Sequence, residues 1–465
     1  MRKGWGCELV LLTLGGSGCT LPRYEPAPLD AASGVQEFST RTLTSPEFLA
    51  FARAHWPFAE EFPSPPRGLE ALTLAGFFHR RELGVARAAL AGARAAEASA
   101  AQRPNPTLTF DPEVVPGNPE PWILGFQLDV PIETAGKRGL RSRAAEERTR
   151  AAEIELYASA WRVRSEVRAT LVEYLAARAE RGALDGLSEA REAQRALLAA
   201  QLAAGRIGRL ELAEVERELA GLALERASLA TRTASARAAL ASALGVPSAA
   251  LEGIELADEL LFELPSAPAA VAARDLGLPS RLDLRAGLSE YSVAEAELAL
   301  EIARAIPDLH LGPGYHWDQG DHKFLLGLAL ELPLFHQNEG PIAEAHAART
   351  AAEARFLARQ ESAIGAIEQA RVAYAGTLQE VEAARQGLVE ARAREARVVR
   401  TLEAGAGDRP GVIGARVARL ELERELGLRA AQAARALGAL EDELQRPLGE
   451  PFEPAPIVEQ GERGT

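Results

Sequence analysis

The stretch "GFQLDVPIETAGKRG", residues 125–139, decides the fold, because it returns as "GLALELPLFHQNEGP" at residues 327–341, an offset of 202 residues. Upstream, "RPNPTLTF" (103–110) matches "AIPDLHL" (305–311), with Pro106 and Pro307 offset by 201. Downstream, "LAAGRIGRLEL", starting at residue 202, matches "LEAGAGDRPGV", starting at residue 402. Three landmarks in the same order at a nearly constant offset predict a tandem duplication of about 200 residues.

Each copy of this stretch contains a segment whose hydrophobicity alternates with period two. Every even position from Trp122 to Ile132, and from Phe324 to Leu334, is apolar, whereas the odd positions are mostly polar or small. This alternation predicts strands with one uniformly apolar face. Strands of about 10 residues suit an outer-membrane barrel, and the alternative is a half-buried strand in a soluble sheet. The flanking Ala-rich helical segments have no bulky apolar face to cover the strands. This favours membrane strands over half-buried strands of a soluble sheet.

Four strands are predicted, at about 105–115, 121–133, 308–317 and 323–335. Four strands cannot close a barrel, and open strand edges are not tolerated in lipid. Each protomer is therefore expected to donate a four-stranded sector to an oligomer. Three protomers would form a barrel of 12 strands, wide enough to hold water. The predicted fold class is thus an α+β membrane protein with four transmembrane strands and long helical hairpins.

Helical patterns cover about 69–101, 138–245, 281–305, 341–404 and 411–445. A continuous helix over 138–203 would extend on the order of 100 Å, which is far longer than a globular domain needs. The motifs "GRIG" (205–208) and "GAGDRPG" (405–411) have turn chemistry that folds each long helix back on itself. Interspersed Ala and charged residues predict a coiled-coil-like cylinder with wet inner and outer faces.

The N-terminus, "MRKGWGCELVLLTLGGSGCTLP", has a charged start, a short apolar core and small residues up to Cys19. Residues 1–18 are predicted to be a secretory signal. Cys19 is predicted to be a lipid anchor, because it would be the only cysteine of the mature chain and would have no disulfide partner. Simple cleavage nearby is the alternative. No later segment has the 18 or more apolar residues of a transmembrane helix.

Composition and motifs narrow the function further. The net charge of −14 argues against nucleic acid, which needs a basic face. "TAGKRG" (134–139) resembles a P-loop, but Pro131 stands where the leading Gly is required. No G-x-S-x-G, H-E-x-x-H or C-x-x-C motif occurs, so no catalytic residue, cofactor or enzymatic activity is predicted.

The predicted domain organisation follows these signals. In chain order it comprises the signal (1–18), a Pro-rich tether with one helix around 45–55 (19–67), the first repeat (68–246), a loop-like linker (247–280), the second repeat (281–446) and a C-terminal tail (447–465).

On these residues the chain resembles the TolC family of outer-membrane efflux factors over nearly its whole length after the signal. "DVPIETAGKRG" (129–139) and "RPGVIGARVARLELE" (409–423) are most similar to its CzcC-like branch, which is linked to heavy-metal cation efflux. The resemblance implies a homotrimer with a 12-stranded barrel in outer-membrane lipid and a long periplasmic helical tunnel. It also implies that the helical tips contact a periplasmic adaptor (membrane fusion) protein, which works with an inner-membrane RND pump.

The resemblance assigns adaptor contacts to the two helical turns. In this chain those positions are Gly205 and Gly405, flanked by Arg206, Arg209 and Arg409.

Some members of the family close the tunnel with acidic residues just after the second turn. This chain has Gly411 and Gly414 there, so a constriction built from the second repeat is not expected. Glu211 and Glu214 follow the first turn, and they could form a constriction or simply a solvated helix face.

Five of the seven histidines fall within residues 310–346. By strand phase, His310, His316 and Asp318 point away from the aromatic residues of the same strand and towards the lumen. Asp318–His322 is predicted to be the tight turn that follows. Since these residues are spread over several elements, a lumenal and loop cluster of His310, His316, Asp318 and His322 is expected rather than a metal site.

The leading hypothesis is a passive exit duct in the outer membrane, part of a tripartite RND-type efflux system that exports heavy-metal cations. A duct for organic compounds or drugs, or for type I protein secretion, remains an alternative. From another class, the chain could be a periplasmic coiled-coil lipoprotein without a pore.

Overall fold

The computed structural model describes residues 24–56, 58, 61–266 and 278–448. The chain divides into two compact units, Met1–Thr40 and Arg41–Thr465. The described part of the first unit contains the helix α1 (Ala31–Thr40). The predicted signal, Cys19 and nearly all of the predicted tail lie outside the described residues.

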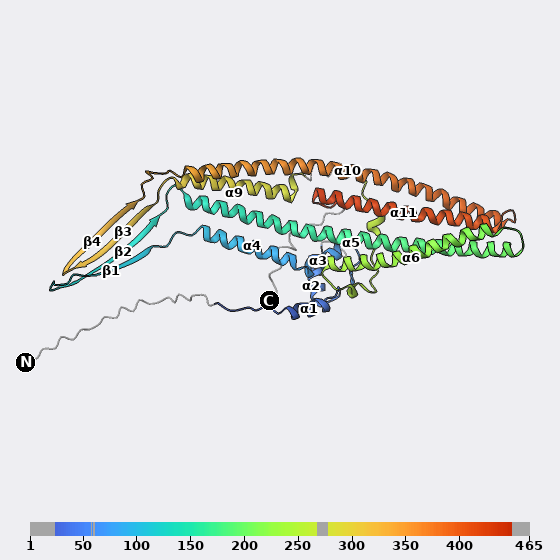
Figure 1. Cartoon of the computed structure of the whole chain (residues 1–465), viewed down its shortest axis with the longest axis horizontal. Coiled ribbons are helices and arrows are strands. Elements are labelled where there is room, and N and C mark those ends of the chain that lie inside the picture. The colour runs from blue at the N-terminus through green and yellow to red at the C-terminus, as the bar shows by residue number, and fades with distance from the viewer. Residues whose placement is uncertain (1–23, 57, 59–60, 267–277, 449–465) are drawn as a thin grey trace, which may run out of the picture. The chain divides into compact units, whose positions relative to one another are not determined.

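The second unit contains the same succession of elements twice (Figure 1). Its first part comprises α2 (Pro46–His55), α3 (Leu69–His79), α4 (Arg81–Ala100), β1 (Thr107–Val114), β2 (Trp122–Ile132), α5 (Lys137–Ala203) and α6 (Arg209–Leu244). Its second part comprises η1 (Ser248–Leu251), α7 (Glu259–Phe262), α9 (Leu282–Arg304), β3 (Leu309–Asp318), β4 (Asp321–Leu330), α10 (Glu339–Glu403) and α11 (Arg409–Leu444). A shorter helix, two strands and two long helices therefore occur in the same order in each repeat.

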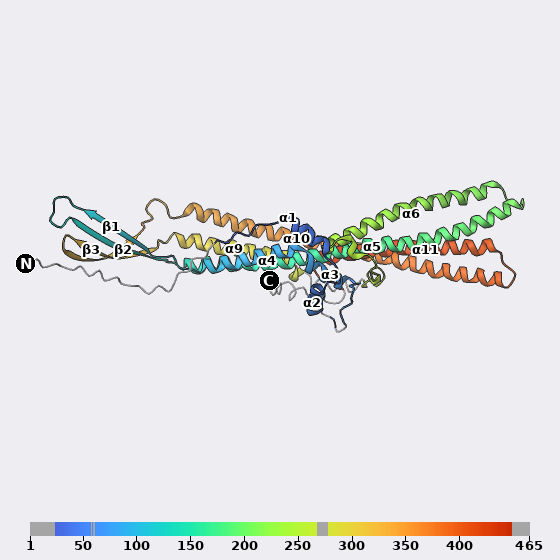
Figure 2. The same cartoon turned by 90° about the horizontal axis from the view of Figure 1, so that it is seen from below.

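The helices of the second unit pack side by side. Near the sheet, α4 packs on α5, α5 on α9 and α9 on α10; towards the helical turns, α6 packs on α5, α5 on α11 and α11 on α10 (Figure 2). Helix α5 has 67 residues, so it extends about 100 Å from the sheet to its turn. Among the described residues, no helix combines the length and hydrophobicity needed to cross a membrane.

Buried side chains recur at intervals of seven residues on two of the long helices. They are Ile367, Tyr374, Val381 and Leu388 on α10, and Val215, Leu222 and Leu229 on α6. This spacing keeps one seam of each helix facing its neighbour and is that of a left-handed coiled coil. Many other buried positions are Ala, which allows the helix axes to approach closely.

A buried ionic cluster joins α3, the middle of α5 and the C-terminal end of α11. Glu441 accepts from Arg164 (Nη1–Oε2, 3.2 Å) and lies 3.3 Å from Nε of Arg168, while Glu70 lies 3.6 Å from Arg164. A Cβ at Gly438 would overlap the Arg168 guanidinium, so this glycine opens the space that the arginine occupies. Because α5 belongs to the first repeat and α11 to the second, the cluster ties the repeats together.

The four strands form one antiparallel sheet in the order β1-β2-β3-β4, so β2 and β3 join the two repeats. Strands β3 and β4 are linked by a two-residue turn, with Asp318 opposite Asp321. Both turn residues, Gln319 (φ 51°) and Gly320 (φ 101°), have the positive φ that two-residue hairpins require. The turn is therefore shorter than the predicted turn over 318–322, because Asp318 and Asp321 already belong to the strands.

The fourth strand also ends earlier than the predicted residue 335. Strand β4 stops at Leu330, opposite Leu309, where β3 begins. No strand of the described chain pairs with residues 331–335, so the alternating pattern continues there without ladder hydrogen bonds.

The predicted helix 69–101 is interrupted at Arg80, whose backbone is extended (φ −78°, ψ 122°). Guanidinium groups bind carbonyls near the break: Arg41 donates to the carbonyl of His79 (3.1 Å), and Arg80 to that of Ala243 (3.3 Å). These partners come from distant segments, so the helical pattern of the sequence could not reveal the break.

The Pro-rich tether was predicted to contain one helix, but α1 is present in addition to α2. Asp30 caps the start of α1, accepting from the backbone N–H groups of Ala32 (3.0 Å) and Ser33 (3.2 Å). An Asp before a helical segment is a recognised start signal, and the prediction overlooked it.

We expect Glu441→Ala to lower the free energy of unfolding by about 3–5 kcal/mol, because it leaves two arginines buried without their shared carboxylate. The matched control is Glu173→Ala, which removes an exposed ion pair to Arg435 across the same two helices and should cost less than about 1 kcal/mol. Urea unfolding in detergent, followed by far-UV circular dichroism, measures both values. Equal losses in the two variants would contradict a stabilising role for the cluster.

Candidate functional site

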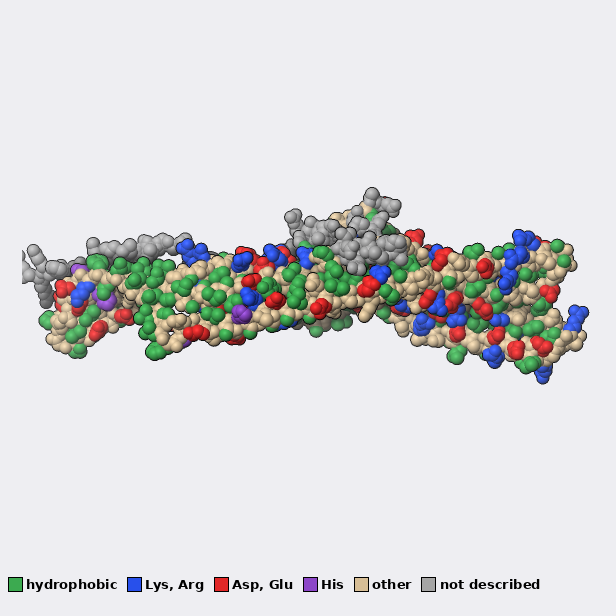
Figure 3. All heavy atoms as spheres, turned by 90° about the horizontal axis from the view of Figure 1, so that it is seen from above, with side chains coloured by type: hydrophobic (Ala, Val, Ile, Leu, Met, Phe, Trp, Pro, Cys, Tyr) green, Lys and Arg blue, Asp and Glu red, His purple; other side chains and the backbone are tan. Residues whose placement is uncertain are grey.

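One face of the sheet is apolar across all four strands. The register places Phe110 opposite Phe126, Phe126 opposite Tyr315, and Tyr315 opposite Phe324. Ring centroids lie 4.8 Å apart in the first of these pairs and 5.4 Å apart in the last. Phe324 is 84% exposed, so the described chain leaves this face open. In Figure 3, hydrophobic side chains gather where the strands meet the long helices, and charged side chains are denser towards the helical turns.

The opposite face of the sheet is polar and mostly acidic. By the strand register it carries five carboxylates and one lysine: Asp111, Glu113, Asp129, Asp318, Asp321 and Lys323. Glycines leave space for larger polar groups on this face. A Cβ at Gly312 would come within 3.0 Å of Nε2 of Gln127, and one at Gly125 within 3.2 Å of Cε1 of His316.

Strands β1 and β4 are open edges of the sheet. Every residue of both strands is exposed. The strand order gives each of them one neighbour within the described chain, so half of their backbone N–H and C=O groups lack a ladder partner. An edge of this kind is a surface for pairing with another strand.

The structure divides the predicted polar cluster between the two faces. His310 lies on the polar face, with Nδ1 3.1 Å from both carboxylate oxygens of Asp129, and His316 and Asp318 are on the same face. His322 lies on the apolar face, where its Nδ1 is 2.6 Å from the Tyr315 hydroxyl.

Within the polar face, six residues separate His310 from His316, which is about 20 Å along a strand. The predicted cluster is therefore not one site. In the part of the chain that the structure describes, no three His, Cys, Asp or Glu residues are placed to hold a metal ion.

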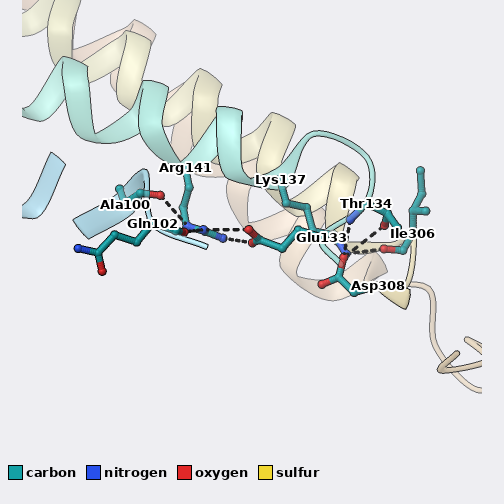
Figure 4. Close-up of polar contacts among 8 residues, drawn as sticks. All are labelled: Ala100, Gln102, Glu133, Thr134, Lys137, Arg141, Ile306 and Asp308. Carbon is teal, nitrogen blue, oxygen red and sulfur yellow. Dashed lines mark hydrogen bonds and ion pairs between the residues drawn. The ribbon is translucent and has the colours of Figure 1, made fainter. Parts of the chain in front are cut away.

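Where the sheet meets the helices, a buried lysine joins the two repeats (Figure 4). Lys137, at the start of α5, donates to the carboxylate of Asp308 (2.7 Å) and to the carbonyl of Ile306 (2.6 Å). Asp308 also accepts from the backbone N–H of Thr134 (2.8 Å). Desolvation alone would raise the pKa of Asp308, but hydrogen bonds from Lys137 and Thr134 together lower it below its usual value. The carboxylate therefore stays ionised opposite the ammonium group.

A second polar group at this junction binds backbone carbonyls at the C-terminal end of α4. Arg141 is paired with Glu133 and donates to the carbonyls of Ala100 (3.3 Å) and Gln102 (3.2 Å). In the second repeat the carbonyl equivalent to that of Ala100 belongs to Glu301, and it accepts from Nδ2 of Asn338 instead (2.7 Å). The two repeats thus satisfy the same helix end with different side chains.

The two helical turns have the same backbone geometry. Gly205 (φ 69°) and Gly405 (φ 75°) adopt the left-handed conformation that ends a helix, each donating to a carbonyl three residues earlier (2.9 Å). Arg206, Arg209 and Arg409 are exposed around them. The predicted tip residues therefore occupy accessible turns, where exposed arginines lie beside exposed acidic residues, Glu211 at the first turn and Asp408 at the second.

Glu211 and Glu214 are exposed on the first turns of α6, and no ion pair of either residue is found among the described residues. Gly411 of the second repeat instead donates to its helix cap, Asp408 (3.0 Å). The acidic side chains after the turns thus belong to the first repeat, and a role in a constriction stays a prediction.

The junction residues Lys137, Arg141 and Asp308 were not predicted from the sequence. One signal was present: "GKRG" falls directly after the strand, where a helix begins. Its partners could not be inferred, because Asp308 is 171 residues away from Lys137 in the chain.

We expect Lys137→Met to lower the free energy of unfolding by about 1–2 kcal/mol, because the Asp308 carboxylate and the Ile306 carbonyl lose their buried donor. Arg138→Met is the matched control: its side chain is exposed, and the change should stay within about 0.5 kcal/mol. Thermal unfolding of the two variants at the same pH compares them. A Lys137→Met variant as stable as the control would show that the junction depends on other contacts.

Comparisons with known proteins bear on the fold. Neither the scan against protein-family models nor the search of curated proteins gave a match. Among solved structures, the outer membrane protein VceC of Vibrio cholerae is similar, with a TM-score of 0.64 and 20% identity over 82% of this chain and 96% of that one. The MtrE outer membrane channel of Neisseria gonorrhoeae has a TM-score of 0.62 and 16% identity, covering 81% and 88%.

The CmeC outer membrane channel of Campylobacter jejuni has a TM-score of 0.60 and 16% identity, covering 87% of this chain and 89% of that one. These similarities extend over nearly the full length of each of the three proteins. The long paired helices and the small sheet of this chain therefore have the TolC-like fold of outer-membrane channels.

Proposed function

We propose that three copies of this chain form the exit duct of an efflux system in the outer membrane. The observation that carries the proposal is the sheet: one face is apolar and uncovered, the other is polar, and both edges are open. Outer-membrane strands have this alternation, with apolar residues towards lipid and polar residues towards the lumen. Three four-stranded sectors would supply the 12 strands of a water-filled barrel.

The long helices extend this duct into the periplasm. Helix α5 is about three times as long as the hydrocarbon core of a bilayer is thick, so the turns at Gly205 and Gly405 would lie far from the membrane. The exposed arginines on both turns, together with the exposed acidic residues beside them, offer charged groups of both signs to a periplasmic adaptor, which would connect the duct to an inner-membrane RND pump. Cys19 would add a lipid anchor at the start of the mature chain.

The acidic excess on the polar face favours cations as the exported substrate. Five carboxylates against one lysine in each copy would give the lumen a negative potential, which attracts cations and repels anions. This supports the heavy-metal branch of the resemblance. A duct for organic compounds or for secreted proteins shares the same architecture, and the pump would decide between them.

Purified protein in planar bilayers should conduct ions in stable steps and prefer cations, because an acidic, water-filled barrel admits them. Native mass spectrometry in detergent should report a trimer. A monomer without conductance would instead support the periplasmic lipoprotein without a pore.

Deletion of the gene separates the substrate classes. Sensitivity to zinc, cobalt, cadmium, nickel or copper salts is the expected result. An unchanged metal profile with sensitivity to dyes or detergents would indicate organic substrates, and loss of a secreted protein would indicate secretion.

The orientation of the sheet can be tested with two adjacent residues. Phe126→Lys places a charge on the lipid face and should destabilise the folded state in phospholipid bilayers by about 2–4 kcal/mol. Gln127→Lys places the same charge on the polar face and should be tolerated. Urea unfolding from liposomes measures the difference, and the reverse order of stabilities would contradict the assignment of the faces.

A further inference from the structure

A histidine and a carboxylate meet on the polar face of the sheet, between a strand of the first repeat and one of the second. His310, the second residue of β3, lies opposite Pro131 of β2. Its ring reaches diagonally to Asp129, two residues earlier on the same face of β2, and Nδ1 lies 3.1 Å from both carboxylate oxygens. We call this pair the Asp129–His310 dyad. Its side chains are 43% and 42% exposed, so the dyad is open to the space in front of the polar face.

The chemistry of the dyad decides which ring nitrogen is free. An ionised carboxylate only accepts hydrogen bonds, so Nδ1 of His310 must carry the proton that is donated to Asp129. In the neutral imidazole, the lone pair is then on the other nitrogen, Nε2. Within the described residues, Nε2 has no hydrogen-bond partner, and it is not a buried atom. The dyad therefore presents an available ligand nitrogen to the solvent.

Such an arrangement is typical of histidines that bind metals. A metal-binding histidine usually donates its second ring N–H to a carboxylate or carbonyl, which orients the ring and makes the ligand nitrogen more basic. Imidazole nitrogen suits zinc, copper, nickel and related divalent ions, whereas sodium, potassium, magnesium and calcium ions prefer oxygen ligands.

We propose that Nε2 of His310, oriented by Asp129, is a transient ligand for divalent transition-metal cations that pass along the polar face. This role rests on the proposed function, in which the polar face lines the lumen of a cation duct. It goes further in naming the residue that contacts the cargo and the class of cation that the lumen distinguishes from hard cations.

Small residues leave room for a hydrated ion beside the dyad. His310 pairs across the ladder with Ala329 of β4, and Gly312, the next residue of β3 on the same face, pairs with Gly327. Neither strand therefore places a bulky side chain over the dyad. The group closest to a Cβ built at Gly312 would be the amide Nε2 of Gln127, at 3.0 Å, so the adjoining side chain is polar as well.

The positive charges near the dyad are already paired. Asp308, two residues before His310, binds the ammonium group of Lys137. The four described strands contain one basic side chain, Lys323, which lies opposite His316. His316 is six residues from His310, about 20 Å along the strand. A cation at His310 thus meets no unpaired positive charge of the described strands, whereas one at His316 would approach an ammonium group.

His316 therefore provides a comparison within the same strand and on the same face. Its ring lies over Gly125 of β2, since a Cβ at that glycine would come within 3.2 Å of Cε1 and 3.3 Å of Nε2. No carboxylate within the described chain forms a hydrogen bond with this ring. His316 has neither the orienting partner nor the open surroundings of His310, so it is not expected to select the same ions.

The duplication shows that strand pairing does not require the dyad. By the offsets of 202 and 201 residues, the counterpart of Asp129 is Glu331 and that of His310 is Thr109. Thr109 takes its place in the ladder opposite Gln127 without an imidazole. Each copy of the chain therefore has one dyad, and the role of its histidine lies outside the architecture of the sheet.

A dyad of this kind would bind an ion weakly, as conduction requires. In a barrel of 12 strands, wide enough to hold water, the dyads of three copies would lie on separate walls and could not converge on one ion. Among the described residues, no third His, Cys, Asp or Glu completes a metal group. Water would fill the remaining coordination positions, and a site on a conduction path must release its ion readily.

Zinc block of the potassium current tests the dyad in the full-length, tag-free protein in planar bilayers. Asp129→Asn should raise the half-blocking zinc concentration about tenfold, the usual effect of removing the carboxylate behind a metal-binding histidine. His310→Gln should raise it at least as much, because the ligand itself is lost. The matched controls are His316→Gln and Asp111→Asn, which change the same residue types on the same face and should shift the zinc block less than twofold. Each current is normalised to that of the same variant without zinc.

Magnesium separates ligand chemistry from charge. It has the same charge as zinc but prefers oxygen ligands, so His310→Gln should leave the block by magnesium unchanged. Equal shifts for the two ions would mean that charge alone acts, which would overturn the dyad as a selective ligand.

Nickel provides a binding readout that does not depend on current. In trimers with ¹³C-labelled histidine in detergent, paramagnetic Ni²⁺ should broaden the imidazole signal of His310 at the lowest concentration. That signal is identified by its loss in His310→Gln. Earlier broadening of the His316 signal would contradict the assignment.

The outcomes distinguish the dyad from the duct. Conducting trimers whose zinc block is the same in the wild type and in His310→Gln would overturn the dyad and leave the proposed function intact. Protein that forms no conducting pore would reject the duct, and the role of the dyad in its lumen with it.

Discussion

The main physical constraint on this sheet is that the backbone N–H and C=O groups along each strand edge need hydrogen-bond partners. In lipid, an unpaired backbone N–H or C=O has no water to bind, so an open sheet cannot persist there. The chain has a four-stranded sheet with an uncovered apolar face and two open edges, and this combination is the basis of the proposed closure by further copies. An alternating sequence, duplicated once, thus accounts for the four strands and the two faces of the sheet.

The long helices extend away from the sheet and pack side by side. Seven-residue spacing keeps neighbouring helices in contact along their length, and small residues bring them close. Polar groups then fix the helices at defined points. Glu441 joins α5 to α11 through buried arginines, and Lys137 joins the start of α5 to the segment that precedes β3. Both contacts link the first repeat to the second, so they set the register between halves that coiled-coil packing alone would leave free to slide.

The periodic features of the fold could be predicted from the sequence, and the breaks in that periodicity could not. The strands, the long helices and their glycine turns follow local patterns, so their predicted positions agree with the structure to within a few residues. The break at Arg80 depends on carbonyls bound by side chains from other segments, and the end of β4 depends on where β3 begins. The candidate site shows the same division. The alternating faces were predictable, whereas His322 was grouped with the polar residues because its strand was predicted to begin after it.

By itself, the sequence determined the duplication, the two-faced strands and the helical hairpins, because each is a repeat of side-chain type at a period set by backbone geometry. Only the tertiary structure decided which charges meet. Arg164 and Glu441 are 277 residues apart, and Lys137 and Asp308 are 171 apart. Such pairs depend on how distant elements align when they pack, and a local sequence pattern cannot predict that alignment.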